Sequence, residues 1–261
     1  MDSSLIDTHC HLNYDYAPKT TDDLIREAGL AGVETLVTIG VDLTTIAPVR
    51  ELSEKYHNVY HTQGVHPHEA ISIQDGDLDQ IRMAARHPKC RAIGEIGLDY
   101  HYDHSPRDVQ LKIFRAQLDL ALETDQPVVI HSRDAETELL AGLEAYARQV
   151  KGDHPKGIIH CFTGTYEFGR RCVELGFYIS FSGIITFKKA DDLRRCAMDF
   201  PLEQILVETD SPYLAPIPFR GKKCEPSMVK LTAQKIAEIR KISFDDVAQA
   251  TTKNAKRVFR I

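Results

Sequence analysis

The chain has 261 residues, close to the length of one α/β barrel, and we expect a single domain over residues 1–261. Its 43% hydrophobic and 27% charged residues are typical of a globular protein and argue against a disordered or fibrous chain. The net charge of −6 argues against a protein that coats nucleic acid with a basic face, although it leaves room for an enzyme that gathers a few bases and metal ions in one cleft.

The six cysteines are scattered and include no C-x-x-C pair, which predicts reduced thiols rather than a disulfide framework. The amino-terminal residues show no secretory signal, and no apolar run approaches the ~20 residues that a membrane span needs. We therefore expect a cytoplasmic enzyme that is not attached to a membrane. The sequence indicates no stable protein partner.

Short β-branched apolar runs alternate with longer helical patterns along the chain. The predicted strands cover residues 4–9, 33–39, 59–65, 91–96, 127–131, 157–160, 177–182 and 204–209. The predicted helices between them cover residues 20–30, 44–56, 77–87, 107–124, 134–149, 166–175 and 189–199, and two or three helical segments, with patterns at 226–240, 243–250 and 251–259, follow the last strand.

Continuous apolar strands separated by helices are typical of βαβ units in a parallel sheet. Eight such units predict an α/β fold of the closed (β/α)₈ TIM-barrel type. An open doubly wound sheet is the alternative, but no glycine-rich phosphate loop follows the first predicted strand.

The tripeptide His9-Cys10-His11 ends the first predicted strand. Residues i and i+2 of an extended chain point to the same face, so both imidazoles are expected to project together while Cys10 turns to the packed wall. Two imidazoles on one rigid element provide half of a metal site. The alternative is a pair of ordinary polar residues at a strand end.

Four more side chains that can bind a metal end predicted strands: Glu95 on the fourth, His131 on the fifth, His160 on the sixth and Asp210 on the eighth. A barrel places its chemistry at the carboxyl ends of its strands. Each residue has an ordinary interpretation, such as a loop charge, a satisfied barrel histidine or a helix cap. Their coincidence at strand ends favours one shared site.

The motifs that carry these residues run from residue 5 to about residue 226: IDTHCHL, GVHPH, IGEIGLDY, VVIHSRDA, IIHCFTG and VETDSPYL. In this order and spacing they resemble the TatD family of metal-dependent deoxyribonucleases, within the amidohydrolase-like barrels. The resemblance implies a site with two divalent metal ions whose ligands are His9, His11, Glu95, His131, His160 and Asp210. It also implies that both ions share Glu95 and that the substrate is DNA, trimmed as single strands in the 3'-5' direction.

One departure from the family pattern is visible. The family has Arg-Asn-Glu-Pro or a close variant where this chain reads Lys223-Cys224-Glu225-Pro226, so a hydrogen bond from that asparagine is not expected here.

The residue types themselves suit two-metal chemistry. Four neutral imidazoles and two carboxylates around two divalent ions leave a local charge of about +2, which attracts a phosphodiester. Paired ions stabilise the attacking and leaving oxygens and lower the pKa of bound water. We expect Asp210 and Glu95 to be catalytic, with Asp210 as the proton acceptor. Imidazole ligands favour Zn, Ni or Co, whereas the resemblance implies Mg, so Mg, Zn, Mn, Ni and Co all remain candidates.

The predicted substrate contacts are His66, Arg133 and the loop cations Arg220, Lys222 and Lys223. The planar fork of Arg133 suits a phosphate, although a salt bridge to Asp134 or Glu136 is the alternative. The loop is expected to grip a nucleic-acid backbone, and its alternative is a solvated charge cluster. Asp99 and Glu208 are expected to support the residues around them.

Two other functions stay open. Amidohydrolase-like barrels host many chemistries, so an amide, ester or small phosphoester hydrolase is the alternative enzyme. Many of those relatives bridge their ions with a carboxylated lysine, and Glu95 in its place favours the nuclease branch. A non-catalytic metal-dependent binding protein is the alternative outside enzymes, although structural metal sites are usually closed by protein ligands.

Overall fold

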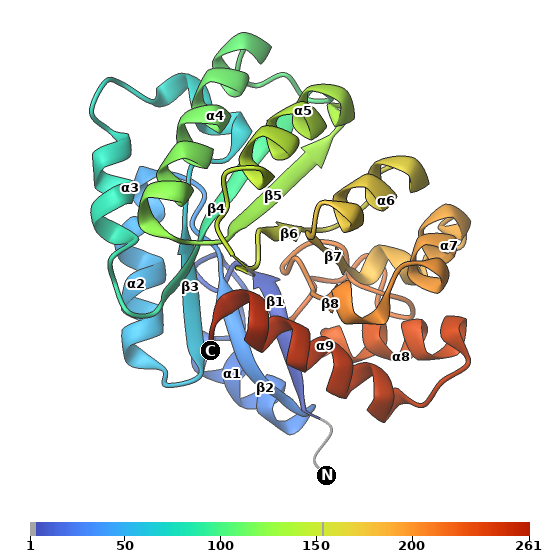
Figure 1. The fold of residues 1–261 in the computed structure, drawn as a ribbon. Coiled ribbons are helices and arrows are strands. Elements are labelled where there is room, and N and C mark those ends of the chain that lie inside the picture. The colour runs from blue at the N-terminus through green and yellow to red at the C-terminus, as the bar shows by residue number, and fades with distance from the viewer. Residues whose placement is uncertain (1–3, 153) are drawn as a thin grey trace.

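A computed structural model describes residues 4–152 and 154–261. Its strands pair in parallel in the order β1 to β8 (Figure 1). They are β1 (Leu5–Cys10), β2 (Val33–Thr38), β3 (Val59–Gln63), β4 (Cys90–Asp99), β5 (Val128–Arg133), β6 (Gly157–Ile159), β7 (Tyr178–Phe181) and β8 (Ile205–Val207). A parallel bridge between Cys10 and Ser211 joins β1 to the segment after β8, so the sheet curls round into a nearly closed barrel and the predicted fold class is confirmed.

Helices follow the strands and cover the outside of the barrel (Figure 1). They are α1 (Thr21–Leu30), α2 (Ile46–Lys55), α3 (Leu78–Ala84), α4 (Arg107–Thr124), α5 (Glu136–Ala147), α6 (Tyr166–Glu174), α7 (Asp191–Asp199), α8 (Val229–Arg240) and α9 (Phe244–Phe259). Short 3₁₀ turns are η1 (Leu43–Thr45), η2 (Pro67–Ser72), η3 (Gly183–Thr186), η4 (Leu202–Gln204) and η5 (Pro226–Met228). Among the described residues, none of the helices combines the length and the apolar character needed to cross a membrane.

The last helix closes one end of the barrel. Of the two or three helical segments expected after the last strand, the structure has two, because the patterns at 243–250 and 251–259 form the single helix α9, which begins at a capping box of Ser243 and Asp246. The helix continues through Thr251, whose hydroxyl donates back to the Val247 carbonyl. Its apolar face packs on β1 and β8 and contributes to a core cluster with inward-facing strand residues. Because α9 fills this end, the opposite end, where the strands finish, is the one left for a site.

A close approach of β4 and β5 positions two of the predicted site residues. Gly97 has a φ of +143°, and a side chain there would collide with the His131 carbonyl. Glycine alone permits this contact without strain. The approach sets Glu95 on β4 beside His131 on β5.

Hydrogen bonds to Asp7 join β1 to the chain beyond β8. Its buried carboxylate accepts hydrogen bonds from the Thr209 amide (2.9 Å), the Thr209 hydroxyl (2.6 Å) and the His9 amide (3.3 Å). These bonds hold the two strand ends that carry His9 and Asp210 at a fixed separation.

We expect Asp7→Ala to lower the free energy of unfolding by about 3 kcal/mol, because it leaves these buried donors without an acceptor. Urea unfolding of chelator-treated protein measures this without a contribution from bound metal. Asp75→Ala, at an exposed position, is the control. Equal stabilities for the two variants would contradict a structural role for Asp7.

Candidate metal centre

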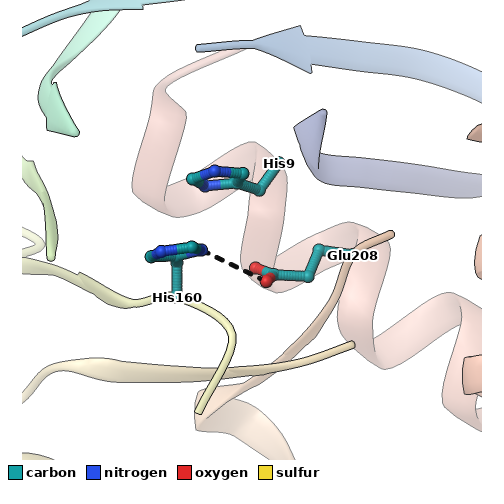
Figure 2. A group of neighbouring side chains, drawn as sticks. All are labelled: His9, His160 and Glu208. Atoms are coloured by element: carbon teal, nitrogen blue, oxygen red, sulfur yellow. Dashed lines mark hydrogen bonds and ion pairs between the residues drawn. The ribbon is translucent and has the colours of Figure 1, made fainter. Parts of the chain in front are cut away.

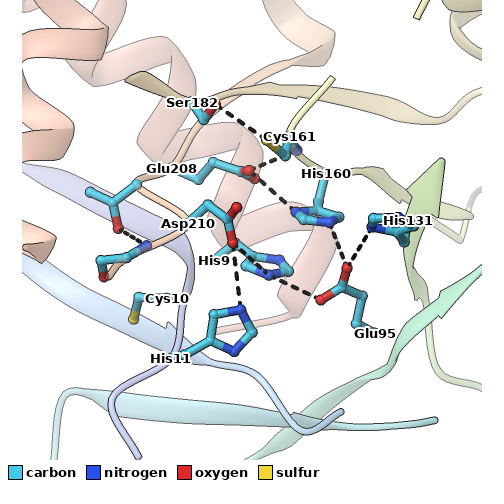
Figure 3. Close-up of polar contacts among 12 residues, drawn as sticks. His9, Cys10, His11, Glu95, His131, His160, Cys161, Ser182, Glu208 and Asp210 are labelled. Atoms are coloured by element: carbon cyan, nitrogen blue, oxygen red, sulfur yellow. Dashed lines mark hydrogen bonds and ion pairs between the residues drawn. The ribbon is translucent and has the colours of Figure 1, made fainter. Parts of the chain in front are cut away.

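Glu95 lies at the centre of the predicted site, almost fully buried (Figure 3). Its Oε1 atom is 2.7 Å from His160 Nε2 and 3.0 Å from His131 Nδ1. Its Oε2 atom is 3.4 Å from His9 Nε2. The ends of β1, β4, β5 and β6 therefore meet at one carboxylate, as expected for a shared site. The role of these residues as metal ligands stays a prediction.

Asp210 completes the cluster on the side of β1. Its Oδ1 atom lies 3.6 Å from His9 Nε2 and 3.5 Å from His11 Nε2. Its own amide donates to the His9 carbonyl, in a left-handed conformation with φ of +56°. The Cys10 thiol turns away and donates to the Val37 carbonyl, so the expected alternation of His9-Cys10-His11 is observed.

The donor atoms fit divalent cations. His9 is fully buried, yet neither of its ring nitrogens has a hydrogen-bond partner among the described residues, and the same holds for Nδ1 of His11. Such unpaired buried atoms are costly unless something else binds them. The 3.4–3.6 Å gaps to carboxylate oxygens match two ligands of one ion, whose bonds would each be about 2.0–2.2 Å long.

Two groups of candidate ligands share Glu95. One consists of His9, His11 and Glu95, and the other of His66, Glu95 and His131, with donor atoms within 4.8 Å of one another in each group. A carboxylate has two oxygens, so Glu95 can bind an ion on each side.

His66 lines the metal pocket, and its predicted contact with substrate stays a prediction. Its Nε2 atom also lies 3.5 Å from Glu95 Oε1, which adds His66 to the candidate ligands, a role not predicted from the sequence. Its Nδ1 accepts from the His68 amide, which directs Nε2 towards Glu95. Burial holds the pKa of His66 well below its usual range, so the ring is neutral and able to bind a metal. Its place after the third strand was the available signal.

Carboxylates behind two of the histidines orient the rings. Glu208 Oε1 lies 3.3 Å from His160 Nδ1 and also accepts from the Cys161 amide (Figures 2 and 3). Figure 2 also shows the His9 and His160 rings stacked, with centroids 3.8 Å apart. Asp99 Oδ2 lies 3.0 Å from His131 Nε2. A carboxylate on one ring nitrogen fixes the direction of the other, so both rings present a nitrogen to Glu95.

The charges of the centre are coupled. Burial alone would raise the pKa of Glu95, but the imidazoles of His160 and His66 hold it well below its usual range. Burial would lower the pKa of His160, but the carboxylates of Glu95 and Glu208 raise it well above its usual range. His160 therefore keeps a proton to higher pH than an ordinary histidine. A metal needs the neutral ring, so metal affinity is expected to increase with pH.

A pocket of about 460 Å³ opens over this cluster, and its wall includes His66 and Arg133. The Arg133 guanidinium lies 5.0 Å from the Tyr102 ring centroid. The expected alternative partners of Arg133 are engaged elsewhere, since Asp134 contacts His101 and Glu136 accepts from Thr165.

The loop cations lie outside this wall, as far as residues 4–152 and 154–261 define it. The Arg220 guanidinium lies 3.7 Å from the Phe187 ring centroid, and the Lys222 ammonium 5.6 Å from that of Phe219. Lys223 forms an ion pair with Asp15 at 3.1 Å. Cys224, where the family has asparagine, is buried with its thiol 3.9 Å from the Thr209 carbonyl.

A (β/α)₈ barrel that gathers histidines and carboxylates around one buried glutamate at its carboxyl end has the construction of a metal-dependent hydrolase. Residues 6–260 match the family described as TatD related DNase, and the chain belongs to this family.

Its relatives agree with this class. The chain is 43% identical over 257 residues to the protein named uncharacterized metal-dependent hydrolase YabD of Bacillus subtilis (strain 168), covering 98% of this chain and 99% of that protein. It is 34% identical over 248 residues to the 3'-5' ssDNA/RNA exonuclease TatD of Citrobacter koseri, covering 93% and 94%. The crystal structure of YJJV, a TatD homologue from Escherichia coli K12, aligns over 100% of both chains with a TM-score of 0.92 and 30% identity. The protein is thus a metal-dependent hydrolase.

Adding Zn²⁺ or Mn²⁺ to chelator-treated protein should raise its melting temperature, because an ion that binds only the folded state stabilises it by about 2.7 kcal/mol at a hundredfold excess over Kd. We expect His9→Ala and Glu95→Ala to lose this shift. His57→Ala, an exposed histidine remote from the cluster, should keep it.

The far-UV circular dichroism of the chelated protein should stay that of a folded barrel, as expected for a catalytic rather than a structural metal. A full metal-induced shift in the Glu95→Ala variant would contradict the central place given to this carboxylate.

Proposed function

We propose that the protein is a two-metal phosphodiesterase that degrades DNA, trimming single strands in the 3'-5' direction. The observation that carries the proposal is the presence of Glu95 in two of the three groups of candidate ligands found among the described residues. Two ions held by one carboxylate suit an in-line displacement at phosphorus. The family description and the activity named for the Citrobacter koseri relative support DNA as the substrate. The candidate ions are Mg, Zn, Mn, Ni and Co.

When bound, the ions would supply Lewis acidity for the phosphate and for a water nucleophile. His9, His11 and Asp210 would hold one of them, His131, His160 and His66 the other, and Glu95 both. Burial would raise the pKa of Asp210, but the hydrogen bond from His11 and the charges of His9 and His160 lower it. Asp210 is therefore ionised at neutral pH and able to take the proton of the attacking water.

Substrate contacts would come from the pocket wall. Arg133 has its guanidinium supported by Tyr102, and it can donate two parallel hydrogen bonds to a phosphate. Tyr213 is half exposed at the same wall and offers its ring to a base. These two groups would orient the strand above the ions without reading its sequence.

A substrate panel tests the proposal. The metal-loaded protein is incubated with single- and double-stranded DNA labelled at either end, with RNA, and with small esters and amides. We expect stepwise loss of nucleotides from the 3' end, fastest on single-stranded DNA. Hydrolysis of esters or amides without any release from DNA would replace the nuclease by the alternative enzyme.

Glu95→Ala and Asp210→Ala should each abolish hydrolysis while leaving the fold intact. A positioned general base alone contributes about 10²–10⁴-fold to the rate, and loss of the shared carboxylate also removes charge from both ion positions. Turnover, metal content and melting temperature are measured together, with the exposed Glu51→Ala as the control. Near-normal turnover in either site variant would end the assignment of its residue.

A further inference from the structure

A second hollow adjoins the metal pocket. It has a volume of about 510 Å³ and lies between the loop from β6 to α6 and the loop from β7 to α7. Thr163 and Ile184 belong to the walls of both hollows. A linear substrate whose reacting bond lies over Glu95 can therefore extend outward past these two residues, towards the neighbouring helices α6 and α7 (Figure 1). We call this second hollow the α6–α7 groove.

The α6–α7 groove carries arginines held on aromatic rings. The Arg195 guanidinium lies 4.3 Å from the ring centroid of Tyr166, and Arg220 lies 3.7 Å from that of Phe187. Both rings belong to the groove wall, and so does Lys189. A guanidinium stacked on a ring keeps its charge and its N–H edges available, because the ring competes with neither.

Few carboxylates of the protein lie close enough to these cations to neutralise their charge. Within the described part of the chain, Arg220 has no carboxylate within 4.0 Å, and the only contact of this kind for Arg195 is Asp199 at 3.7 Å on the exposed surface. Among the described residues, Asp192 is the one acidic residue of the groove wall. The wall therefore offers a net positive surface in a chain whose net charge is −6.

The backbone under the groove is held in place. Arg194 donates to the carbonyls of Ile185, Phe187 and Lys188, which fixes the segment that carries the Phe187 ring. The long loop after Asp210 packs on the same segment, since the Ile217 amide donates to the Thr186 hydroxyl. Arg220 reaches Phe187 because its loop is anchored there.

A larger hollow of about 700 Å³, which contains Lys222 and Lys223, differs in its position relative to the metal pocket. Its wall has no residue in common with the metal pocket, as far as the described residues define the two. Its Lys19 is neutralised by Glu27 at 2.7 Å and Glu225 at 2.6 Å, and Lys223 by Asp15, whereas Lys222 and Lys230 have no carboxylate within 4.0 Å among the described residues. The loop cations thus separate: Arg220 is stacked on Phe187 of the α6–α7 groove wall, and the two lysines line a hollow that shares no described residue with the metal pocket.

We propose that the α6–α7 groove is a subsite for single-stranded nucleic acid next to the cleaved bond, in which Lys189, Arg195 and Arg220 hold the phosphates of the nucleotides beyond the metal pocket. The proposal rests on the proposed function. Cations with aromatic groups beside them are the pattern that binds single strands without sequence preference. Contacts to phosphates position the strand and carry no base information, so the subsite is expected to act on length and affinity rather than on sequence.

The test compares two substrates: a 30-nucleotide single-stranded DNA and the dinucleotide d(TpT), whose one phosphate occupies the metal pocket alone. The groove variant combines Lys189→Gln, Arg195→Gln and Arg220→Gln. The matched control combines Lys112→Gln, Lys241→Gln and Lys253→Gln, which removes the same charge at exposed positions elsewhere. A third variant combines Lys222→Gln and Lys223→Gln.

We expect the groove variant to raise KM for the 30-nucleotide strand about tenfold or more with little change in kcat, because contacts made equally in the ground and transition states affect KM. The slope of log KM against log salt should decrease by about 2, from three lost phosphate contacts at about 0.7 each on single strands. Turnover of d(TpT) should be unchanged. A variant with Arg195→Lys and Arg220→Lys, which keeps the charges, should retain most of the affinity, and the matched control should behave as wild type.

Equal KM values for the groove variant and the matched control would overturn the proposal, and so would a larger effect of the Lys222 and Lys223 variant, which would place the strand in the other hollow. A loss of d(TpT) turnover equal to that on the long strand would also overturn it, since the residues would then shape the metal site. If wild type cleaves neither substrate, the proposed function itself fails. If wild type cleaves both and the groove variant does the same, only the subsite fails.

Discussion

The buried carboxylate of Glu95 is the constraint on which the rest of the site depends. A charge removed from water must be compensated nearby, because an unpaired buried carboxylate costs several kcal/mol. The compensation here comes from imidazoles on β1, β5, β6 and the segment after β3, all within 3.5 Å of its oxygens. A closed parallel barrel brings so many strand ends round one point, whereas an open sheet would bring only neighbouring strands to it. The fold and the chemistry are thus linked through a single side chain.

Outward from the Glu95 carboxylate, histidines come first and further carboxylates lie behind them. The histidines surround Glu95, and a second set of carboxylates, Glu208 and Asp99, stands behind His160 and His131. His160 and His131 are therefore each held between two carboxylates, which explains how these two buried rings keep fixed directions. At neutral pH the carboxylates of this arrangement carry more negative charge than the protonated histidines can offset. Bound divalent cations would complete the balance, and without them the carboxylates of Glu95 and Glu208 raise the pKa of His160.

The parts of the site that could be predicted are those that follow from the periodicity of strands. His9, Glu95, His131 and His160 lie at or near strand ends, and strand ends converge in any barrel. The approach of His66 to Glu95 did not follow from the sequence, because it depends on the turn after β3, where the amide of His68 fixes the ring. The sequence left open whether two or three helical segments follow the last strand, and the structure has two because packing on β1 and β8 accompanies one continuous helix α9.

The pairs Arg195–Tyr166 and Arg220–Phe187 could not be predicted from the sequence either. Each pair joins segments about thirty residues apart, and their contact is fixed only by how α6, α7 and the loop after Asp210 pack.

These pairs show why net charge is a poor guide to the partner of an acidic protein. At Lys19 the chain places carboxylates against a cation and cancels it. Over Tyr166 and Phe187 it supports guanidinium groups with rings, which stabilise their position without cancelling their charge. The charge beside these two guanidinium groups is positive although the net charge of the chain is negative. Salt screens both charges over distances longer than the Debye length of about 8 Å. Under the proposed function, a polyanion would therefore be attracted only where it already lies close to these guanidinium groups.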